Sequence, residues 1–320
     1  MHSTDSQHVR SSGSPGAAAR GLELRDDEMS SRAAGENFPV ALRVLPDGAR
    51  EALSAIYAYA RLVDETGDRP GSGADEILSA LDALEAELDL AMQADPAHPT
   101  FIRLQRVIAT HGLSRAHFAG LIEANRRDQL VTRYASWEEL RDYCRLSAEP
   151  VGRLVLEVFG CANAQTEPLS DDVCSALQLL EHCQDVAEDL GNGRIYLPAD
   201  DLARFGCDPA TLSAPTASKQ LREVIRFQVD RARELLASGS LLVSRLHGAA
   251  RIAVAGYVAG GLATARAIER CDYDVLANQA GPARRHIVSS WLRLMIAAMF
   301  SSSRPRGSRR ASTALPGRAA

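Results

Sequence analysis

The feature that most constrains the fold is a helical pattern of apolar residues that runs almost unbroken from about residue 34 to residue 300. Ala, Leu, Arg and Glu dominate this stretch, and no convincing run alternates apolar and polar residues as a β-strand would. Pro and Gly interrupt the pattern at intervals, which marks turns between helices. The sequence therefore predicts an all-α fold with a single helical domain over residues 34–300. The predicted helices cover residues 47–67, 74–93, 98–111, 114–129, 136–159, 170–190, 216–245, 247–271 and 282–300.

The two ends of the chain differ from this pattern. Residues 1–33 are rich in Ser, Gly, Arg and Asp, and residues 301–320 have a similar composition with a basic bias. Segments of this kind bury too little apolar surface to offset the entropy lost on ordering. We therefore predict disordered tails at both ends. Within the domain, Ser114 and Ser136 are candidate N-caps. Ser170, followed by Asp171 and Asp172, opens the sixth predicted helix with the negative charge that a helix dipole favours.

The bulk composition excludes some classes of function. With a net charge of −5 and a pI near 5.9, the chain lacks the basic bias of nucleic-acid-binding proteins, so we expect no nucleic-acid partner. The six cysteines are scattered without metal-ligand spacing. The sequence shows no secretory signal with an apolar core, and no apolar stretch reaches the roughly 18–20 residues that span a bilayer. We therefore predict a cytoplasmic protein.

The first of two acidic motifs lies in the segment AIYAYARLVDETGD. Asp64 and Asp68 are four residues apart, so a helix places them on one face, one turn from each other. Tyr57 and Arg61 continue the same stripe toward the N-terminus. Most neighbours are small, aromatic or apolar, and carboxylates buried among them are costly unless a cation or metal compensates their charge. For an isolated pair of this spacing, a solvated acidic face is the alternative.

The second acidic motif, in ALQLLEHCQDVAEDLGNGRIYLP, repeats this arrangement. Asp185 and Asp189 are again four residues apart on a predicted helix. Gln178, Glu181 and His182 lie on the same side, one or two turns earlier. A lone histidine such as His182 is usually a satisfied core or surface residue, and a direct catalytic role is the less favoured alternative. Two apolar helices that each carry such a pair are poorly explained as surface features.

The paired carboxylates suit a strongly anionic diphosphate bound through Mg²⁺, which prefers octahedral coordination by oxygen. Metal ions held between two facing helices would neutralise the leaving diphosphate. Arg194 and Tyr196, in the loop after the second motif, would add a cationic and a phenolic group. Loss of diphosphate from an allylic or cyclopropylcarbinyl carbon leaves a carbocation, which requires a dry, apolar pocket with aromatic faces.

These segments, together with ENFPVALRVLP near the start, resemble the squalene/phytoene synthase family of head-to-head prenyl transferases. Within that family they are similar to the bacterial hydroxysqualene synthase branch of hopanoid and squalene biosynthesis. The resemblance covers about residues 35–280. It implies an isoprenoid-synthase-type helical bundle around a central cavity, a requirement for Mg²⁺ and a prenyl diphosphate substrate. It also suggests functional coupling to other enzymes of the squalene pathway.

The resemblance assigns roles by position. The catalytic, metal-binding positions correspond to four carboxylates, Asp64, Asp68, Asp185 and Asp189. The candidate substrate-binding residues are Asn37, Phe38, Tyr57, Arg61, Tyr143, Gln178, Glu181, Gln184, Arg194, Tyr196 and Tyr257. The segment YCRLSAEPVGRLVLEVFG resembles the family's cavity helix, which places Tyr143, Ala148 and Val151 along a hydrocarbon tunnel. For Tyr257, a packed core aromatic is an equally good alternative.

Departures from the family pattern bear on the reaction. Condensing members usually have Asn four residues before the first Asp of the second motif and Arg immediately before it, where this chain has Glu181 and Gln184. A His often found before the N-terminal signature is absent from SRAAG at residues 31–35. Condensation holds two diphosphates, whereas presqualene diphosphate carries one. We therefore predict Mg²⁺-dependent ionisation of presqualene diphosphate, with water capturing the cation to give hydroxysqualene.

Two alternatives stay open. The first is a head-to-head condensing squalene or phytoene synthase that uses farnesyl or geranylgeranyl diphosphate. The second is a non-catalytic scaffold member of the family. A scaffold would be expected to lose the metal-binding carboxylates, and all four are retained.

The segment HIVSSWLRLMIAAMF at residues 286–300 is apolar, too short to span a bilayer, and followed by several Arg up to residue 310. It either packs on the core as a terminal helix or lies at a membrane interface with its basic tail near anionic lipid. The second reading predicts peripheral contact of residues 286–310 with the inner face of the membrane.

Overall fold

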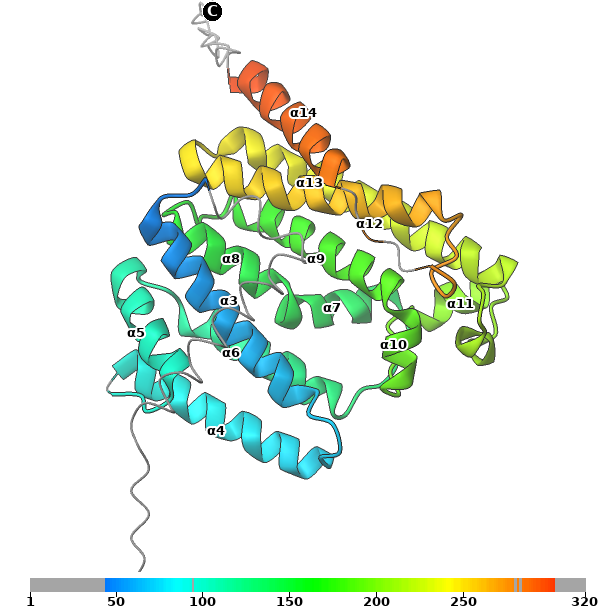
Figure 1. The fold of residues 1–320 in the computed structure, drawn as a ribbon, viewed down its shortest axis with the longest axis horizontal. Coiled ribbons are helices and arrows are strands. Elements are labelled where there is room, and N and C mark those ends of the chain that lie inside the picture. The colour runs from blue at the N-terminus through cyan, green and yellow to red at the C-terminus, as the bar shows by residue number, and fades with distance from the viewer. Residues whose placement is uncertain (1–43, 94, 279–280, 282–283, 303–320) are drawn as a thin grey trace, which may run out of the picture.

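The computed structural model describes residues 44–93, 95–278, 281 and 284–302, and the predicted all-α fold is confirmed (Figure 1). Outside the helices of this part of the chain, a single isolated β-bridge joins Arg133 to Ile195. The helices are α3 (Asp47–Gly67), α4 (Ala74–Gln93), α5 (Pro99–His111), α6 (Arg115–Asp128), α7 (Trp137–Ser147), α8 (Glu149–Val158), α9 (Glu167–Gln184), α10 (Val186–Gly191), α11 (Ala199–Arg204), the 3₁₀ helix η1 (Pro209–Ser213), α12 (Lys219–Arg245), α13 (Gly248–Arg270) and α14 (Arg284–Ser302).

Some predictions fall outside the described residues. These are the candidate site residues Asn37 and Phe38, the predicted tail at residues 1–33, and the predicted C-terminal tail beyond Ser302. The predicted domain ends at residue 300, whereas α14 continues two residues further, to Ser302.

The predicted helix over residues 136–159 is two helices. Its start is as predicted, because the side chain of Ser136 accepts a hydrogen bond from the N–H of Glu139 at 3.3 Å. α7 then ends at Ser147, and Ala148 has φ −122° and ψ −48°. Pro150, in the first turn of α8, has no N–H with which to continue the helical hydrogen bonds. The proline therefore accounts for the break.

Ser170 does not open the next helix, as the sequence predicted. α9 begins at Glu167, with Thr166 in the capping position, and Ser170 is buried within its first turns. Pro168 stands at the start of α9, where a missing N–H costs no helical hydrogen bond. Pro168, a residue type that the sequence pattern assigns to turns between helices, is thus the start signal of α9.

The hydrophobic core has two parts. One packs α3, α4, α5, α6 and α8 around the fully buried rings of Tyr59, Phe101 and Phe118. The edge-to-face contacts of Tyr59 with the two phenylalanines have centroid distances of 5.6 and 5.1 Å. The other part packs α7, α9, α12 and α13. Phe159 and Tyr257 pack against both parts, so Tyr257 lies where the two halves of the core meet.

The segment after α10 runs beside the segment after α6. The Ile195 N–H donates to the carbonyl oxygen of Thr132 at 2.9 Å. Four residues later, the Ala199 N–H donates to the carbonyl oxygen of Tyr134 at 3.0 Å. This short extended pairing fixes the loop that follows the second acidic motif against the C-terminal end of α6.

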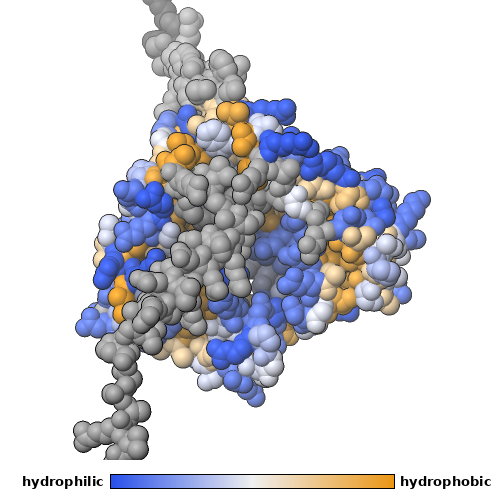
Figure 2. All heavy atoms as spheres, in the orientation of Figure 1, coloured by the Kyte–Doolittle hydropathy of each residue, from blue (hydrophilic) through white to orange (hydrophobic). Residues whose placement is uncertain are grey.

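The last helix, α14, packs on α13 through one face. Ile287 is buried there, and Trp291 donates from Nε1 to the carbonyl oxygen of Ile252 at 3.2 Å. The other face exposes Val288 at 45% and Leu292 at 49%, and Figure 2 shows apolar side chains beside this helix. Core packing thus accounts for one face, while membrane contact through the other stays a prediction. Within the described ranges, no helix is both long and apolar enough to cross a bilayer.

Candidate active site

The first acidic pair lies at the C-terminal end of α3. Asp64 is on the last turn and Asp68 caps it, with the Asp68 N–H donating to the Asp64 carbonyl oxygen at 2.8 Å. Asn125 of α6 donates from Nδ2 to Asp64 Oδ1 at 3.2 Å. This contact depends on Gly67, because a Cβ there would lie 1.9 Å from Asn125 Oδ1. The close approach of α3 to α6 therefore orients one carboxylate of the pair.

Asp64 keeps contact with solvent but lies in crowded, partly acidic surroundings. Loss of hydration raises the pKa of Asp64 to about 6, against the lowering effect of the Asn125 hydrogen bond. The negative charges of Asp68 and Asp128 raise this pKa further, and Arg61 lowers it. The charged carboxylate is therefore held at a free-energy cost that a bound cation would offset.

The second acidic pair departs from the prediction of one helix over residues 170–190, which was wrong. α9 ends at Gln184, Asp185 has φ −100° and ψ 17°, and α10 begins at Val186. Asp favours helix ends over interiors because its side chain competes for backbone groups, and it stands at the break. The turn between the two carboxylates survives, because the Asp189 N–H donates to the Asp185 carbonyl oxygen at 2.8 Å.

Asp185 and Asp189 are poorly compensated by positive charge. Desolvation, followed by the charges of Asp189 and Glu188, raises the pKa of Asp185 to about 6, while His182 lowers it. Oδ2 of Asp189 is buried and has no hydrogen-bond partner among the described residues. Nδ1 of His182 lies 3.8 Å from it. A metal ion or an ordered water is the usual partner of such an oxygen.

Arg194 joins the two motifs. Its Nη1 donates to Asp68 Oδ1 at 2.8 Å, which connects the end of α3 to the loop after α10. The Arg194 side chain is 15% exposed, whereas that of Asp68 is 54% exposed. Both carboxylate pairs therefore border the same region, and Figure 2 shows a hollow rimmed by hydrophilic side chains between the places that α3 and α10 occupy in Figure 1.

A buried carboxylate holds two tyrosines beside this ion pair. Tyr143 donates to Asp128 Oδ2 at 2.6 Å and Tyr196 donates to Asp128 Oδ1 at 2.9 Å. The ring of Tyr196 stacks on His182 with 3.9 Å between centroids. Burial raises the pKa of Asp128, and the two hydroxyls and Arg194 oppose that rise. The hydrogen bond to Asp128 therefore fixes the position of Tyr196, which follows Arg194 by two residues in the same loop.

Asp128 and Asn125 were not predicted from the sequence as site residues. Both lie on the last turn of α6, and Asp128 is its final residue. A negative charge at a helix C-terminus opposes the helix dipole, and this was the one available signal.

The hydrogen bonds to Asp128 also give Tyr143 a position other than the predicted one. Tyr143 is absent from the described residues that line the cavity, because its buried hydroxyl turns to Asp128 as an acceptor.

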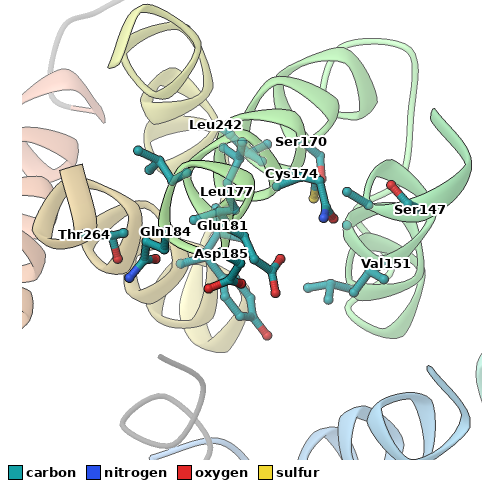
Figure 3. A pocket seen from close by; sticks show the side chains of 18 of the residues that line it. Ser147, Val151, Ser170, Cys174, Leu177, Glu181, Gln184, Asp185, Leu242 and Thr264 are labelled. Carbon is teal, nitrogen blue, oxygen red and sulfur yellow. The ribbon is translucent and has the colours of Figure 1, made fainter. Parts of the chain in front are cut away.

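A cavity of about 530 Å³ lies between α8, α9 and α13 (Figure 3). Its apolar walls include Ala148, Val151 and Tyr257, all three of which the sequence had suggested for a tunnel. The charged or amide groups on its lining come from α9 and the residue after it, and they are Gln178, Glu181, Gln184 and Asp185. Of the described residues that line this cavity, none is Lys or Arg.

The donor set fits a hard divalent cation. In the described ranges, no three or more His, Cys, Asp or Glu side chains converge closely enough to hold one ion. Each acidic pair therefore offers at most two carboxylates to an ion. Mg²⁺ commonly takes one or two protein carboxylates and completes its octahedron with water and phosphate oxygens. Oxygen-only donors and the unpartnered Asp189 oxygen are consistent with that mode.

The other predicted side chains flank the acidic pairs. On α3, Tyr57 is half-buried, and Arg61 pairs with Glu65 at 3.2 Å. On α9, Nε2 of Gln178 lies 3.4 Å from Nε2 of His182. Arg61 and Gln178 are therefore each engaged with a neighbour one turn away on the same helix.

An all-helical bundle with two acidic pairs, one of which contributes Asp185 to the lining of a largely apolar cavity, defines an isoprenoid-synthase-type protein. The sequence profile of squalene/phytoene synthase matches residues 31–295, and the chain belongs to that family.

A hydroxysqualene synthase of Sinorhizobium fredii is 36% identical over 212 residues, which cover 66% of this chain and 71% of that protein. A phytoene synthase of Mycobacterium tuberculosis is 32% identical over 277 residues, covering 84% and 90%. The crystal structure of squalene synthase HpnC from Alicyclobacillus acidocaldarius has 41% identity and a TM-score of 0.69, and the match covers 79% of this chain and 96% of that one.

Proposed function

We propose that this enzyme ionises presqualene diphosphate with the help of Mg²⁺ and that water captures the cation, releasing hydroxysqualene and diphosphate. The observation that carries the proposal is the charge of the cavity lining. Glu181 and Asp185 are acidic, and no described lining residue is Lys or Arg. A site for two diphosphates needs more positive charge than a site for one, because each anion must be paired. The likeness to a hydroxysqualene synthase supports the same reaction.

In this proposal each acidic pair would hold Mg²⁺ through its own two carboxylates, Asp64 with Asp68 and Asp185 with Asp189. When bound, Mg²⁺ supplies Lewis-acid neutralisation of the leaving diphosphate. Arg194 adds a guanidinium that can hold phosphate oxygens through paired hydrogen bonds. Its place is fixed by the loop pairing at Ile195, so it reaches the same region as the carboxylates.

The apolar walls would protect the carbocation from solvent. Val151, Val155 and Leu177 line the cavity from α8 and α9, and Val254 and Tyr257 close it from α13. Aliphatic walls exclude bulk water, and an aromatic ring stabilises a passing cation through its negative face. The reaction would formally be that of a carbon–oxygen lyase acting on a diphosphate.

A head-to-head condensing squalene or phytoene synthase that uses farnesyl or geranylgeranyl diphosphate is the second candidate. The match to a phytoene synthase over 90% of that protein's length favours it. The acidic lining of the cavity opposes it, since two bound diphosphates would face Glu181 and Asp185.

The two candidates are separated by product analysis. The purified protein is incubated with Mg²⁺ and without NADPH, in parallel with farnesyl, geranylgeranyl or presqualene diphosphate, and the products are identified by mass spectrometry. We expect hydroxysqualene from presqualene diphosphate and no coupling of the other two. Coupling of either shorter substrate, with presqualene diphosphate untouched, would establish the condensing alternative. A folded protein that turns over none of the three would support the scaffold reading, and omission of Mg²⁺ tests the metal.

We also propose a peripheral position at the inner face of the membrane. The product is almost entirely hydrocarbon, so release into lipid is favourable. The exposed Val288 and Leu292 on α14 supply an apolar face of the kind that enters a bilayer interface.

A further inference from the structure

Ser147 carries a buried hydroxyl that has no hydrogen-bond partner in the part of the chain that the structure describes. It is the last residue of α7 and lines the cavity. Its Oγ is buried and makes no hydrogen bond to any other described residue. Ser and Thr on helices commonly bond the carbonyl oxygen one turn earlier, as Thr66 and Thr110 do here, both at 2.7 Å. Ser147 does not follow this pattern, so a water molecule that approached its hydroxyl would displace no hydrogen bond to another described residue.

The wall around Ser147 is otherwise apolar. Ala148, Val151 and Val155 follow it along the same side of the α7–α8 junction and all line the cavity. None of these side chains can hold a water molecule. A water on this wall would therefore be held at one place, by the Ser147 hydroxyl.

The facing wall supplies further polar groups. Figure 3 shows Ser147 and Val151 opposite Ser170, Cys174 and Glu181, which α9 contributes. An ordered water needs two or more polar partners and enough room, and a cavity of about 530 Å³ provides the room. An unpaired buried hydroxyl is destabilising until such a water satisfies it. The unpaired hydroxyl and the polar groups across the cavity thus favour an ordered water molecule beside Ser147.

We propose that Ser147 Oγ holds the water molecule that captures the carbocation. The inference rests on the proposed function, and it assigns a reacting water to a residue outside both acidic motifs. Ionisation breaks the carbon–oxygen bond, and the electron pair leaves with the diphosphate. A lone pair of the water oxygen then forms the new bond to the cationic carbon. The surplus proton of that water passes to the released diphosphate, so presqualene diphosphate and water give hydroxysqualene and protonated diphosphate.

Without a held water, the cation has a competing exit. A carbon next to the cationic centre can lose a proton to the diphosphate, which forms a carbon–carbon double bond and a hydrocarbon product. Ser147 therefore decides the partition between alcohol and hydrocarbon, and leaves the preceding ionisation largely unaffected.

The test compares Ser147→Thr with Ser147→Val. These two side chains have nearly the same shape and differ in a hydroxyl against a methyl group. With presqualene diphosphate and Mg²⁺, we expect Ser147→Thr to keep the alcohol as the main product. Because one hydrogen bond to the water is lost, Ser147→Val should lower the alcohol-to-hydrocarbon ratio roughly tenfold. Diphosphate release is measured in parallel as the readout of ionisation, and the two products are compared per diphosphate released.

Each outcome is decisive. Equal alcohol-to-hydrocarbon ratios for the Thr and Val variants, with diphosphate release intact, would overturn the role of Ser147 and leave the proposed function standing. A wild-type protein that gives no hydroxysqualene from presqualene diphosphate would overturn both. Melting temperatures check that the variants fold, and Ser147→Ala replaces Ser147→Val if the latter does not. Incubation of the wild type in heavy-oxygen water must place the label in the alcohol, and an unlabelled alcohol would refute water capture.

Discussion

Replacing Asp64 with Asn should abolish turnover and yet stabilise the metal-free protein. The pKa of Asp64 is about 6, against an ordinary value of 3.8, chiefly because its carboxylate loses hydration. At neutral pH this difference corresponds to roughly 3 kcal/mol of destabilisation for an unscreened charge. Asp64 keeps contact with solvent, so screening reduces the figure to about 1 kcal/mol. Asn is nearly isosteric and retains an oxygen that can accept the hydrogen bond from Asn125.

The sign of the pH dependence follows from the direction of the pKa change. A raised pKa means that the native state binds the proton more tightly than the unfolded chain does. The charged carboxylate therefore costs the native protein no stability well below pH 3.8, where Asp64 is protonated in both states. This cost grows between pH 3.8 and about 6 and is complete above that range. The stability advantage of Asp64→Asn should therefore be small at pH 4 and complete at pH 7.5.

Thermal unfolding followed by circular dichroism, with EDTA present, measures this effect. We expect the melting temperature of Asp64→Asn to exceed that of the wild type by about 2–4 °C at pH 7.5. Asp68→Asn is the matched control, because it breaks the 2.8 Å ion pair with Arg194 and should give no such gain. A lower melting temperature for Asp64→Asn at pH 7.5, or the same gain at pH 4, would refute the reasoning. Added Mg²⁺ should stabilise the wild type more than Asp64→Asn.

Three further predictions concern other contacts. Gly67→Ala should displace Asn125 and weaken Mg²⁺ binding by about tenfold or more in calorimetric titration. Gly48→Ala on the same helix, whose new Cβ would meet nothing within 4 Å, should not weaken it. Asp128→Asn leaves two buried phenols to share one carbonyl oxygen and should lower the free energy of unfolding by about 1–3 kcal/mol, and an unchanged urea midpoint would contradict this. Leu292→Gln should reduce co-sedimentation with anionic liposomes without changing the melting temperature, and equal co-sedimentation would dismiss membrane contact through this face of α14.

The fold could be predicted where helices are amphipathic and end at clear signals. The predicted bounds of α3 and α4 agree with the structure, because polar, Gly- and Pro-containing segments border both apolar patterns. The breaks at Ala148 and Asp185 were missed because apolar residues continue in register across them. A local interruption of backbone hydrogen bonds leaves the hydrophobic period unchanged, so periodicity alone does not reveal it.

The candidate site was predictable only in part. Asp64 with Asp68, and Asp185 with Asp189, share a spacing that is visible within single segments. The bonds of Asp128 to two tyrosines join residues 15 and 68 positions apart, and no local pattern marks such contacts. Ser147 was likewise invisible as a candidate, because an unpartnered hydroxyl is defined by what surrounds it in space.

The positions of the carboxylates at helix ends extend the argument beyond the two motifs. Asp68 caps the C-terminal end of α3, Asp128 is the last residue of α6, and Asp185 caps the C-terminal end of α9. The C-terminal end of a helix carries partial negative charge, so acidic side chains there are destabilising rather than favourable. The ion pair of Arg194 with Asp68 and the tyrosine bonds to Asp128 place two of these ends side by side. The carboxylates at these three helix ends add negative potential near the acidic pairs. The single positive charge of Arg194 offsets only part of that potential. We therefore expect the need for a cation to arise from the arrangement of the helices as much as from the acidic motifs themselves.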